Sequence, residues 1–98
     1  MKLEWMPLAL KDRIEIFQYI AKDSPQNAVA VDDAIEAQCD QLMDFPQSAR
    51  AGRIADTREL VISGYPFIVV YRLSEETVHL LRVINTSQQW PDGLSFEG

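Results

Sequence analysis

The sequence predicts an α+β domain in which a hairpin of two helices packs on one face of a small, mainly antiparallel sheet. Two patterns carry this prediction. Apolar residues recur every three or four positions in the first half of the chain, and β-branched and aromatic runs separated by short turns fill the second half. With 98 residues, the chain has the length of one domain, expected to span 1–98. The expected order is strand, helix, helix, strand, strand, strand.

The first half is expected to hold one strand and two helices. Residues 2–6 alternate polar and apolar side chains, which is a short-strand pattern, and Pro7 suits the first turn of a helix over 8–22. Ser24 can cap a second helix over 25–45. The residues expected on the buried faces are Leu10, Ile14, Phe17 and Ala21 of the first helix and Ala28, Val31, Ile35, Cys39 and Leu42 of the second.

The second half is expected to form three strands, at 58–62, 67–73 and 77–84, followed by a tail at 85–98. The connections are short enough only for hairpins, so the three strands form an antiparallel meander. Each run is almost continuously apolar, whereas a sheet covered on one face alternates. We therefore expect both faces to need cover. The helix hairpin covers one face, and the tail covers part of the other and leaves a sizeable apolar patch for a partner.

Composition excludes several classes of function. The chain carries 15 Asp+Glu against 9 Lys+Arg, a net charge of −6, which weighs against indiscriminate binding to nucleic acid. A single cysteine, Cys39, and a single histidine, His79, cannot form a disulfide or a Cys/His zinc site, so no metal and no cofactor are expected. No apolar run approaches the roughly 20 residues that span a bilayer. We expect a cytoplasmic protein with no membrane partner.

The basic residues of the second half are all arginines, the side chain suited to bidentate contact with a carboxylate or a phosphate. They either bind an acidic partner or pair internally with Glu59, Glu75 or Glu76. The turn after the second of the three strands can close in more than one register, so Arg72 and Arg82 fall on the same face or on opposite faces. His79, between apolar neighbours in a strand, is interpreted as a structural or surface residue.

Several strings in fixed order carry a family likeness. They are Thr57-Arg-Glu-Leu-Val-Ile62, Tyr65-Pro-Phe-Ile-Val-Val-Tyr-Arg72, Leu80-Leu-Arg-Val-Ile84 and Gln89-Trp-Pro91, preceded by Tyr19-Ile20-Ala21 and a proline-initiated second helix. Over residues 2–91 the chain resembles the RelE/ParE superfamily, the toxins of type II toxin–antitoxin modules. The resemblance implies a toxin without a cofactor, neutralised by a cognate antitoxin and able to form a toxin–antitoxin hetero-oligomer.

The superfamily contains two target classes: RelE-like members cut mRNA in the ribosome, and ParE-like members inhibit DNA gyrase. The nuclease needs groups that move protons and cations that stabilise phosphate charge. The resemblance would place basic residues at Pro66 or Phe67 and within 85–89, where this chain has none. A histidine common among relatives is Asn85 here, which cannot act as a general acid or base. The resemblance therefore favours a ParE-like gyrase inhibitor that is not an enzyme, and no catalytic residue is assigned. The alternatives are a RelE-like endonuclease acting on the ribosome with mRNA, and a degenerate homologue that is no longer toxic.

The partner contacts are expected mainly in the second half of the chain. Trp90 either plugs the open face of the sheet or anchors a protein partner. The antitoxin is expected to lay an extended segment and an amphipathic helix over the toxin, with affinity resting mainly on apolar burial. The candidate residues for contact with the target or the antitoxin are Arg50, Arg53, Arg58, Tyr65, Tyr71, Arg72, Arg82, Asn85 and Trp90.

Overall fold

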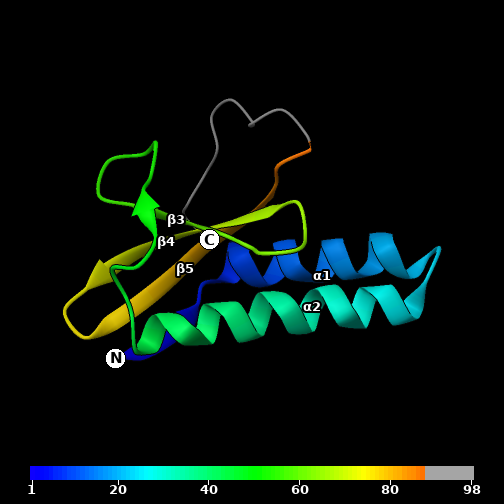
Figure 1. Ribbon diagram of the computed structural model, residues 1–98, viewed down its shortest axis with the longest axis horizontal. Helices are drawn as coiled ribbons and strands as arrows, with labels where there is room; N and C mark the ends of the chain where they lie inside the picture. The colour runs from blue at the N-terminus through cyan, green and yellow to red at the C-terminus, as the bar shows by residue number, and fades with distance from the viewer. Residues whose placement is uncertain (88–98) are drawn as a thin grey trace.

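The computed structural model describes residues 1–87 and confirms the predicted α+β fold (Figure 1). The elements are β1 (Lys2–Trp5), α1 (Pro7–Ala21), α2 (Pro25–Asp40), the 3-10 turn η1 (Gln41–Met43), β2 (Arg50–Ala51), β3 (Arg58–Val61), β4 (Phe67–Ser74) and β5 (Thr77–Asn85). They form one five-stranded sheet in the order β1-β5-β4-β3-β2. β1 pairs in parallel with β5, and every other pairing is antiparallel. None of the helices within 1–87 is long and apolar enough to cross a membrane.

Most expected elements differ from those of the structure by one residue at one end or both, and three differences have structural consequences. The second helix ends at Asp40 and tightens into η1, as helix C-termini often do. The expected loop before β3 contains β2, because Arg50 and Ala51 pair with the first two residues of β3. β5 extends to Asn85, which pairs with Phe67 and therefore does not belong to the tail. Trp90 and the rest of 88–98 lie outside the described residues.

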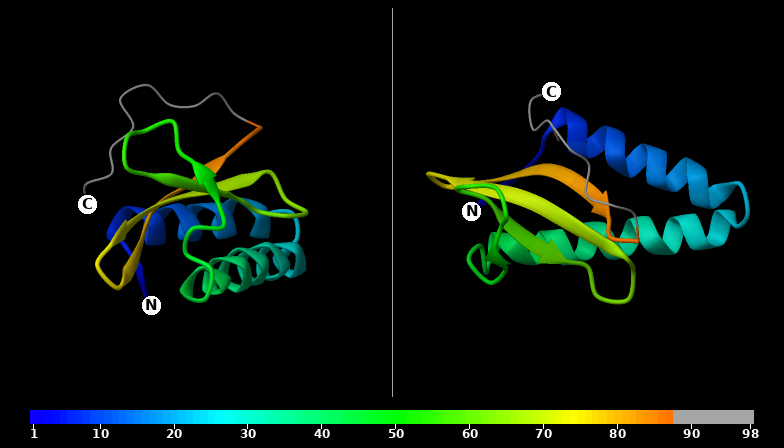
Figure 2. Two further views of the ribbon diagram at one scale, coloured as in Figure 1. Left: turned by 60° about the vertical axis from the view of Figure 1, so that its left-hand side comes forward. Right: turned by 90° about the horizontal axis from the view of Figure 1, so that it is seen from above.

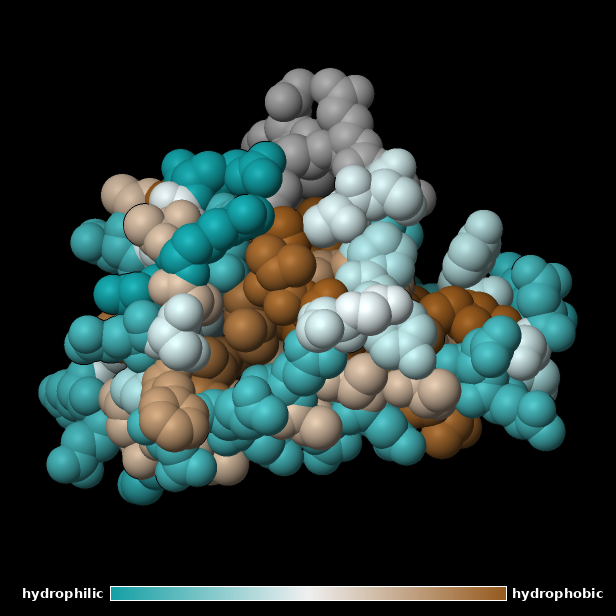
Figure 3. Space-filling model, in the orientation of Figure 1, coloured by the Kyte–Doolittle hydropathy of each residue, from teal (hydrophilic) through white to brown (hydrophobic). Residues whose placement is uncertain are grey.

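The main core lies between the helix hairpin and the sheet (Figure 2). Val31, Ile35 and Cys39 of α2 and Leu42 of η1 are buried there, as their spacing predicts. They meet side chains from the central strands; those of β4 and β5 are Phe67, Val69, Tyr71, Val78, Leu80 and Val83. In the view of Figure 3, apolar side chains fill the space between the sheet and the hairpin, and hydrophilic ones predominate along the outer side of α2.

The predicted buried face of the first helix is wrong for Leu10 and Ile14, whereas Phe17 and Ala21 are half-buried. Leu10 is 44% exposed and Ile14 is 55% exposed, whereas α1 buries Ala9 and Asp12 and packs Ile16 and Ile20 against the core. Both sets of residues follow helical spacing, so periodicity alone cannot choose between them. The choice depends on where α1 runs, because it lies along β5 and turns a carboxylate toward that strand.

Asp12 completes the hydrogen bonding of the β5 edge. β1 pairs with β5 only as far as Leu80, so the backbone N–H of Val83 has no strand partner on that side. Asp12 Oδ2 accepts a hydrogen bond from this N–H at 2.8 Å and another from Arg82 Nε at 2.8 Å. Asp12 Oδ1 accepts from Arg82 Nη2 at 3.0 Å. A buried backbone donor must find an acceptor, and here the acceptor fixes the rotation of α1.

Two side chains from β3 and β4 hold residues 46–49, the segment that connects the helix hairpin to β2. The Tyr71 hydroxyl donates to the Pro46 carbonyl at 2.8 Å. Arg58 Nη1 donates to the carbonyls of Ala49 at 2.9 Å and Gln47 at 3.3 Å. Burial raises the pKa of the fully buried Tyr71. These hydrogen bonds hold the segment that leads into β2.

Glu59 anchors the loop between β2 and β3. Its side chain is 3% exposed and accepts from the Arg53 backbone N–H at 2.8 Å and from Arg50 Nη2 at 3.1 Å. Arg53 Nε lies 3.5 Å from the same carboxylate. Burial alone would raise the pKa of Glu59, but these hydrogen bonds and charges hold it below its ordinary value.

On the face of the sheet away from the hairpin, the described residues of β4 and β5 do not form the open apolar patch that the sequence predicts. Ile68, Val70 and Ile84 form a second cluster there, and all three are buried. Val61, which pairs with Ile68, is 53% exposed. Among the described residues, the exposed large apolar side chains instead include several on the helices, such as Leu10 and Ile14.

Replacing Asp12 should destabilise the fold strongly. Asp12→Ala leaves a largely buried guanidinium and a backbone N–H without their acceptor, which costs about 3 kcal/mol or more. Urea unfolding measures the change in the free energy of unfolding. Glu15→Ala, one turn away and mostly exposed, is the control and should change it by less than about 0.5 kcal/mol. A loss for Asp12→Ala as small as for the control would contradict this role.

The Glu59 carboxylate should make the protein sensitive to acid. Because its pKa is lower in the folded state than in the unfolded chain, its stabilisation is present above the ordinary value of 4.5 and is lost as the pH falls through the folded value. Glu59→Gln should remove this part of the pH dependence, measured as the free energy of unfolding from about pH 7 to about pH 3. Glu76→Gln, in the exposed β4–β5 turn, should keep the wild-type dependence. Equal slopes for Glu59→Gln and the wild type would refute the assignment.

Candidate functional site

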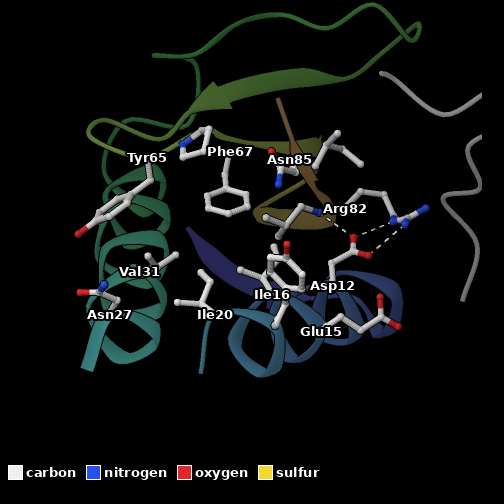
Figure 4. A pocket seen from close by; sticks show the side chains of 14 residues that line it. Asp12, Glu15, Ile16, Ile20, Asn27, Val31, Tyr65, Phe67, Arg82 and Asn85 are labelled. Carbon is white, nitrogen blue, oxygen red and sulfur yellow. Dashed lines mark hydrogen bonds and ion pairs between the residues drawn. The ribbon is translucent and has the colours of Figure 1, made fainter. Parts of the chain in front are cut away.

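A groove opens where the helix hairpin projects past the ends of β4 and β5 (Figure 4). Its volume is about 820 Å³. One wall comes from α1 and the start of α2, and the other comes from the β3–β4 turn and the end of β5. The helix hairpin extends beyond the sheet in Figure 1, and the groove lies on the inner side of this projecting part, where Ile20 and Asn27 line it.

The floor of the groove is apolar. Ile16 and Ile20 come from α1, Val31 from α2, Phe67 from β4 and Val83 from β5. All five also pack in the main core, so the floor is continuous with the interior of the protein. Such a floor gains free energy when a partner covers it with apolar side chains.

The rim of the groove is polar and aromatic. Tyr19 is 73% exposed and lies beside the apolar floor. Asn27 of α2 and Tyr65 of the β3–β4 turn stand on the other sides, and Glu15 adds a carboxylate. An apolar floor with a few polar groups around it is typical of a recognition site.

The Asp12–Arg82 ion pair closes one end of the groove. The two side chains are 11% and 18% exposed, so their charges are held mostly out of water. The hydrogen bonds that Arg82 donates to Asp12 raise the pKa of Arg82, which therefore stays charged. Both carboxylate oxygens accept hydrogen bonds within the protein, so Asp12 acts as a rigid wall.

The titratable side chains that line the described groove are carboxylates, tyrosines and one arginine. Its described lining residues contain no histidine, lysine or cysteine. Asn85 Oδ1 accepts hydrogen bonds from the backbone and the hydroxyl of Ser87, and an amide does not transfer protons at neutral pH. His79 lies on another part of β5, with Nδ1 3.7 Å from the Glu4 carboxylate of β1. Within residues 1–87, no three His, Cys, Asp or Glu side chains gather as metal ligands would.

The structure brings only some of the predicted contact residues together. Tyr65, Arg82 and Asn85 line the groove. Arg50 and Arg53 contact Glu59, and Arg58 and Tyr71 contact backbone carbonyls of residues 46–49. Arg72 is exposed on β4, where it pairs with His79, and Trp90 lies beyond the described residues. The bulge between Val70 and Tyr71 shifts the register, so Arg82 pairs with Val70 and lies on the same face of the sheet as Arg72, two residues further along β4. Arg72 is exposed there, whereas Arg82 binds Asp12.

Sequence reasoning missed the contribution of the hairpin to this groove. Tyr19, Asn27 and the Asp12 carboxylate were not among the predicted contacts, and Ile16 and Ile20 were not assigned to the packed face of α1. One signal was available in the sequence. A second helical face of α1 can be read from spacings of three and four residues, at Ala9, Asp12, Ile16 and Ile20. The Asp12 carboxylate on that otherwise apolar face indicates that a buried hydrogen-bond donor nearby needs an acceptor.

The comparisons with known proteins agree on one family. Residues 3–90 match the family described as ParE toxin of type II toxin-antitoxin system, parDE. A protein of Sinorhizobium fredii (strain NBRC 101917 / NGR234) named "Putative toxin Y4kP" is 42% identical over 93 residues, which cover 95% of this chain and 96% of that protein. A solved structure titled "Chromosomal ParDE TA system from P. aeruginosa" shares the fold, with a TM-score of 0.78, 23% identity, and coverage of 87% of this chain and 95% of that one. The chain therefore belongs to the ParE family of toxins of type II toxin–antitoxin systems.

Proposed function

We propose that the protein is neutralised by a cognate antitoxin that inserts an apolar segment into the groove beside α1, and that the free toxin inhibits DNA gyrase in the cytoplasm. The observation that carries the first part is the groove itself, which has an apolar floor and a polar rim on a rigid frame. The likeness to a chain from a ParDE toxin–antitoxin system supports a partner of this kind.

The groove suits an amphipathic helix better than a small ligand. Its 820 Å³ extend along α1, which presents Ile16 and Ile20 on one face, and the opposite wall is the end of the sheet. A helix with apolar residues at spacings of three and four could bury them against this floor. Its polar side could reach Asn27 and Asn85 at the rim.

The arginines support a contact surface at the groove rather than at the β2–β3 loop. Arg50 and Arg53 contact the buried Glu59, and Arg58 contacts backbone carbonyls, so using them for a partner would sacrifice internal hydrogen bonds. The groove residues Tyr65 and Asn85 belong to the predicted contact set and require no such loss. We expect the affinity to depend mainly on apolar burial and only weakly on salt.

The gyrase target is proposed over ribosomal mRNA cleavage on chemical grounds. Cleavage would need proton-transferring groups and cations near the end of β5, where the described groove offers Asn85 and an arginine already bound to Asp12. The net charge of −6 also opposes docking into ribosomal RNA. Inhibition by binding needs only a surface that contacts the target. A degenerate, non-toxic homologue would retain the groove for the antitoxin without acting on a target.

Truncating Tyr19 should weaken antitoxin binding without harming the fold. Tyr19→Ala removes an exposed aromatic side chain beside the groove, and such anchors are worth about 2 kcal/mol at protein interfaces. Calorimetric titration with the antitoxin encoded beside this protein should show about tenfold or greater loss of affinity. The matched control is Phe45→Ala, which removes another exposed aromatic outside the groove. Equal affinities for both variants and the wild type would contradict the groove as the antitoxin site.

The proposed target can be tested directly with purified components. Free toxin should inhibit supercoiling of relaxed plasmid by DNA gyrase, and added antitoxin should restore it. The same toxin preparation should leave mRNA intact on programmed ribosomes, because no histidine or lysine lines the described groove and its arginine, Arg82, is held by Asp12. Codon-specific cuts in the message, with gyrase unaffected, would replace this proposal with the endonuclease.

A further inference from the structure

A second apolar surface lies on α1 outside the groove. Leu10 and Ile14 are 44% and 55% exposed, and Phe17 lies one turn further along the same side. We call these three residues the α1 stripe. Together with Arg13, Gln18 and Asp32 they line a shallow pocket of about 380 Å³ at the seam between α1 and α2. Exposed apolar side chains that adjoin one another in this way mark interaction sites more often than single ones do.

The α1 stripe and the groove occupy different sides of the same helix. The groove is lined by Asp12, Ile16 and Ile20, whereas the stripe pocket is lined by Leu10, Ile14 and Phe17. At 100° per residue, the two sets lie on different faces of α1. An antitoxin segment in the groove would therefore leave the stripe uncovered and available to a separate occupant.

The charges around the α1 stripe indicate the chemistry of that occupant. Arg13 is already bound: it donates to both Asp32 carboxylate oxygens, at 2.8 and 3.0 Å, and stacks 4.4 Å from the Trp5 ring centroid. Lys11 lies 4.0 Å from Glu15. The outer side of α2 adds the exposed carboxylates Asp33, Glu36 and Asp40, and among them only Glu36 has a cation nearby, Arg13 at 3.4 Å, in the described structure. The charged side chains of α1 and α2 named here are therefore more acidic than basic.

We infer that the α1 stripe docks a basic amphipathic segment of the cellular target, one in which apolar side chains are flanked by lysines or arginines. The inference rests on the proposed function, in which a target separate from the antitoxin exists. Apolar side chains of the segment would enter the shallow pocket, and its cations would lie over the carboxylates of α2. A second copy of this chain would bring two surfaces of the same negative sign together, and an anionic membrane would be repelled in the same way.

The test uses two synthetic helical peptides with the same leucine stripe, one flanked by lysines and the other by glutamates. Fluorescence anisotropy should show that the wild-type protein binds the lysine peptide and that rising salt weakens this binding. The neutral double variant Leu10→Ser/Ile14→Ser should lower the affinity about tenfold or more. The control is Val61→Ser, an exposed apolar residue on β3, which should bind like the wild type. Equal binding by the double variant and the control would overturn the inference.

Growth arrest provides the second arm. The double variant should arrest growth much less than the wild type while keeping wild-type affinity for the antitoxin. Tyr19→Ala should arrest growth like the wild type but bind the antitoxin more weakly. A double variant that loses the antitoxin instead would assign the stripe to the antitoxin and overturn the inference. A wild-type dimer in sedimentation that Leu10→Ser/Ile14→Ser dissociates would overturn it in favour of a second copy. If the wild-type protein does not arrest growth, the proposed toxicity and its target are refuted. The peptide titration would then test only whether the α1 stripe binds a basic amphipathic segment.

Discussion

The hydrogen bonds of the Asp12 carboxylate position the parts of this protein that matter for binding. Asp12 accepts from the Val83 backbone and from Arg82, at the stretch of β5 where β1 no longer pairs. This contact fixes both the place of α1 along the sheet and its rotation. The rotation turns Ile16 and Ile20 toward the groove and leaves Leu10 and Ile14 outside. One carboxylate thus decides which apolar side chains are core and which are surface.

A buried ion pair of this kind contributes more to specificity than to stability. Removing two charges from water costs free energy that their attraction roughly returns, so a well-packed apolar pair could stabilise the fold as much. An apolar pair could not satisfy the Val83 N–H, and it would not select one rotation of α1 over another. The pair also gives the groove a wall that is already ordered, which lowers the entropy that a partner must lose on binding.

The arginines show how one residue type serves several structural purposes in a small domain. Arg82 joins the sheet to α1, Arg58 holds the segment that follows η1, and Arg50 and Arg53 neutralise the buried Glu59. Arg13 links α1 to α2 and stacks on Trp5 of β1. In an acidic chain of this size, guanidinium groups that bind carboxylates and carbonyls join elements that the apolar core reaches only in part. A count of arginines therefore overestimates the surface available to an acidic partner.

The sequence by itself determined the fold class, the strand and helix order and the buried face of α2, because each depends on local periodicity and turn residues. It also determined the superfamily through strings such as Tyr65-Pro-Phe-Ile-Val-Val-Tyr-Arg72. Of the candidate site, it identified Tyr65, Arg82 and Asn85, which lie in or beside the strands that carry the family likeness.

The tertiary structure alone decided the buried face of α1, the pairing of β2, the register at the Val70–Tyr71 bulge and the partner of each arginine. These features depend on contacts between residues far apart in the chain, such as Asp12 and Arg82, which no local pattern encodes. α1 carries two stripes with the same helical spacing, and hydrophobicity favours the one that is exposed. The open edge of β5 selects the other stripe, because only the face that carries Asp12 supplies an acceptor for the Val83 N–H while it also buries Ile16 and Ile20.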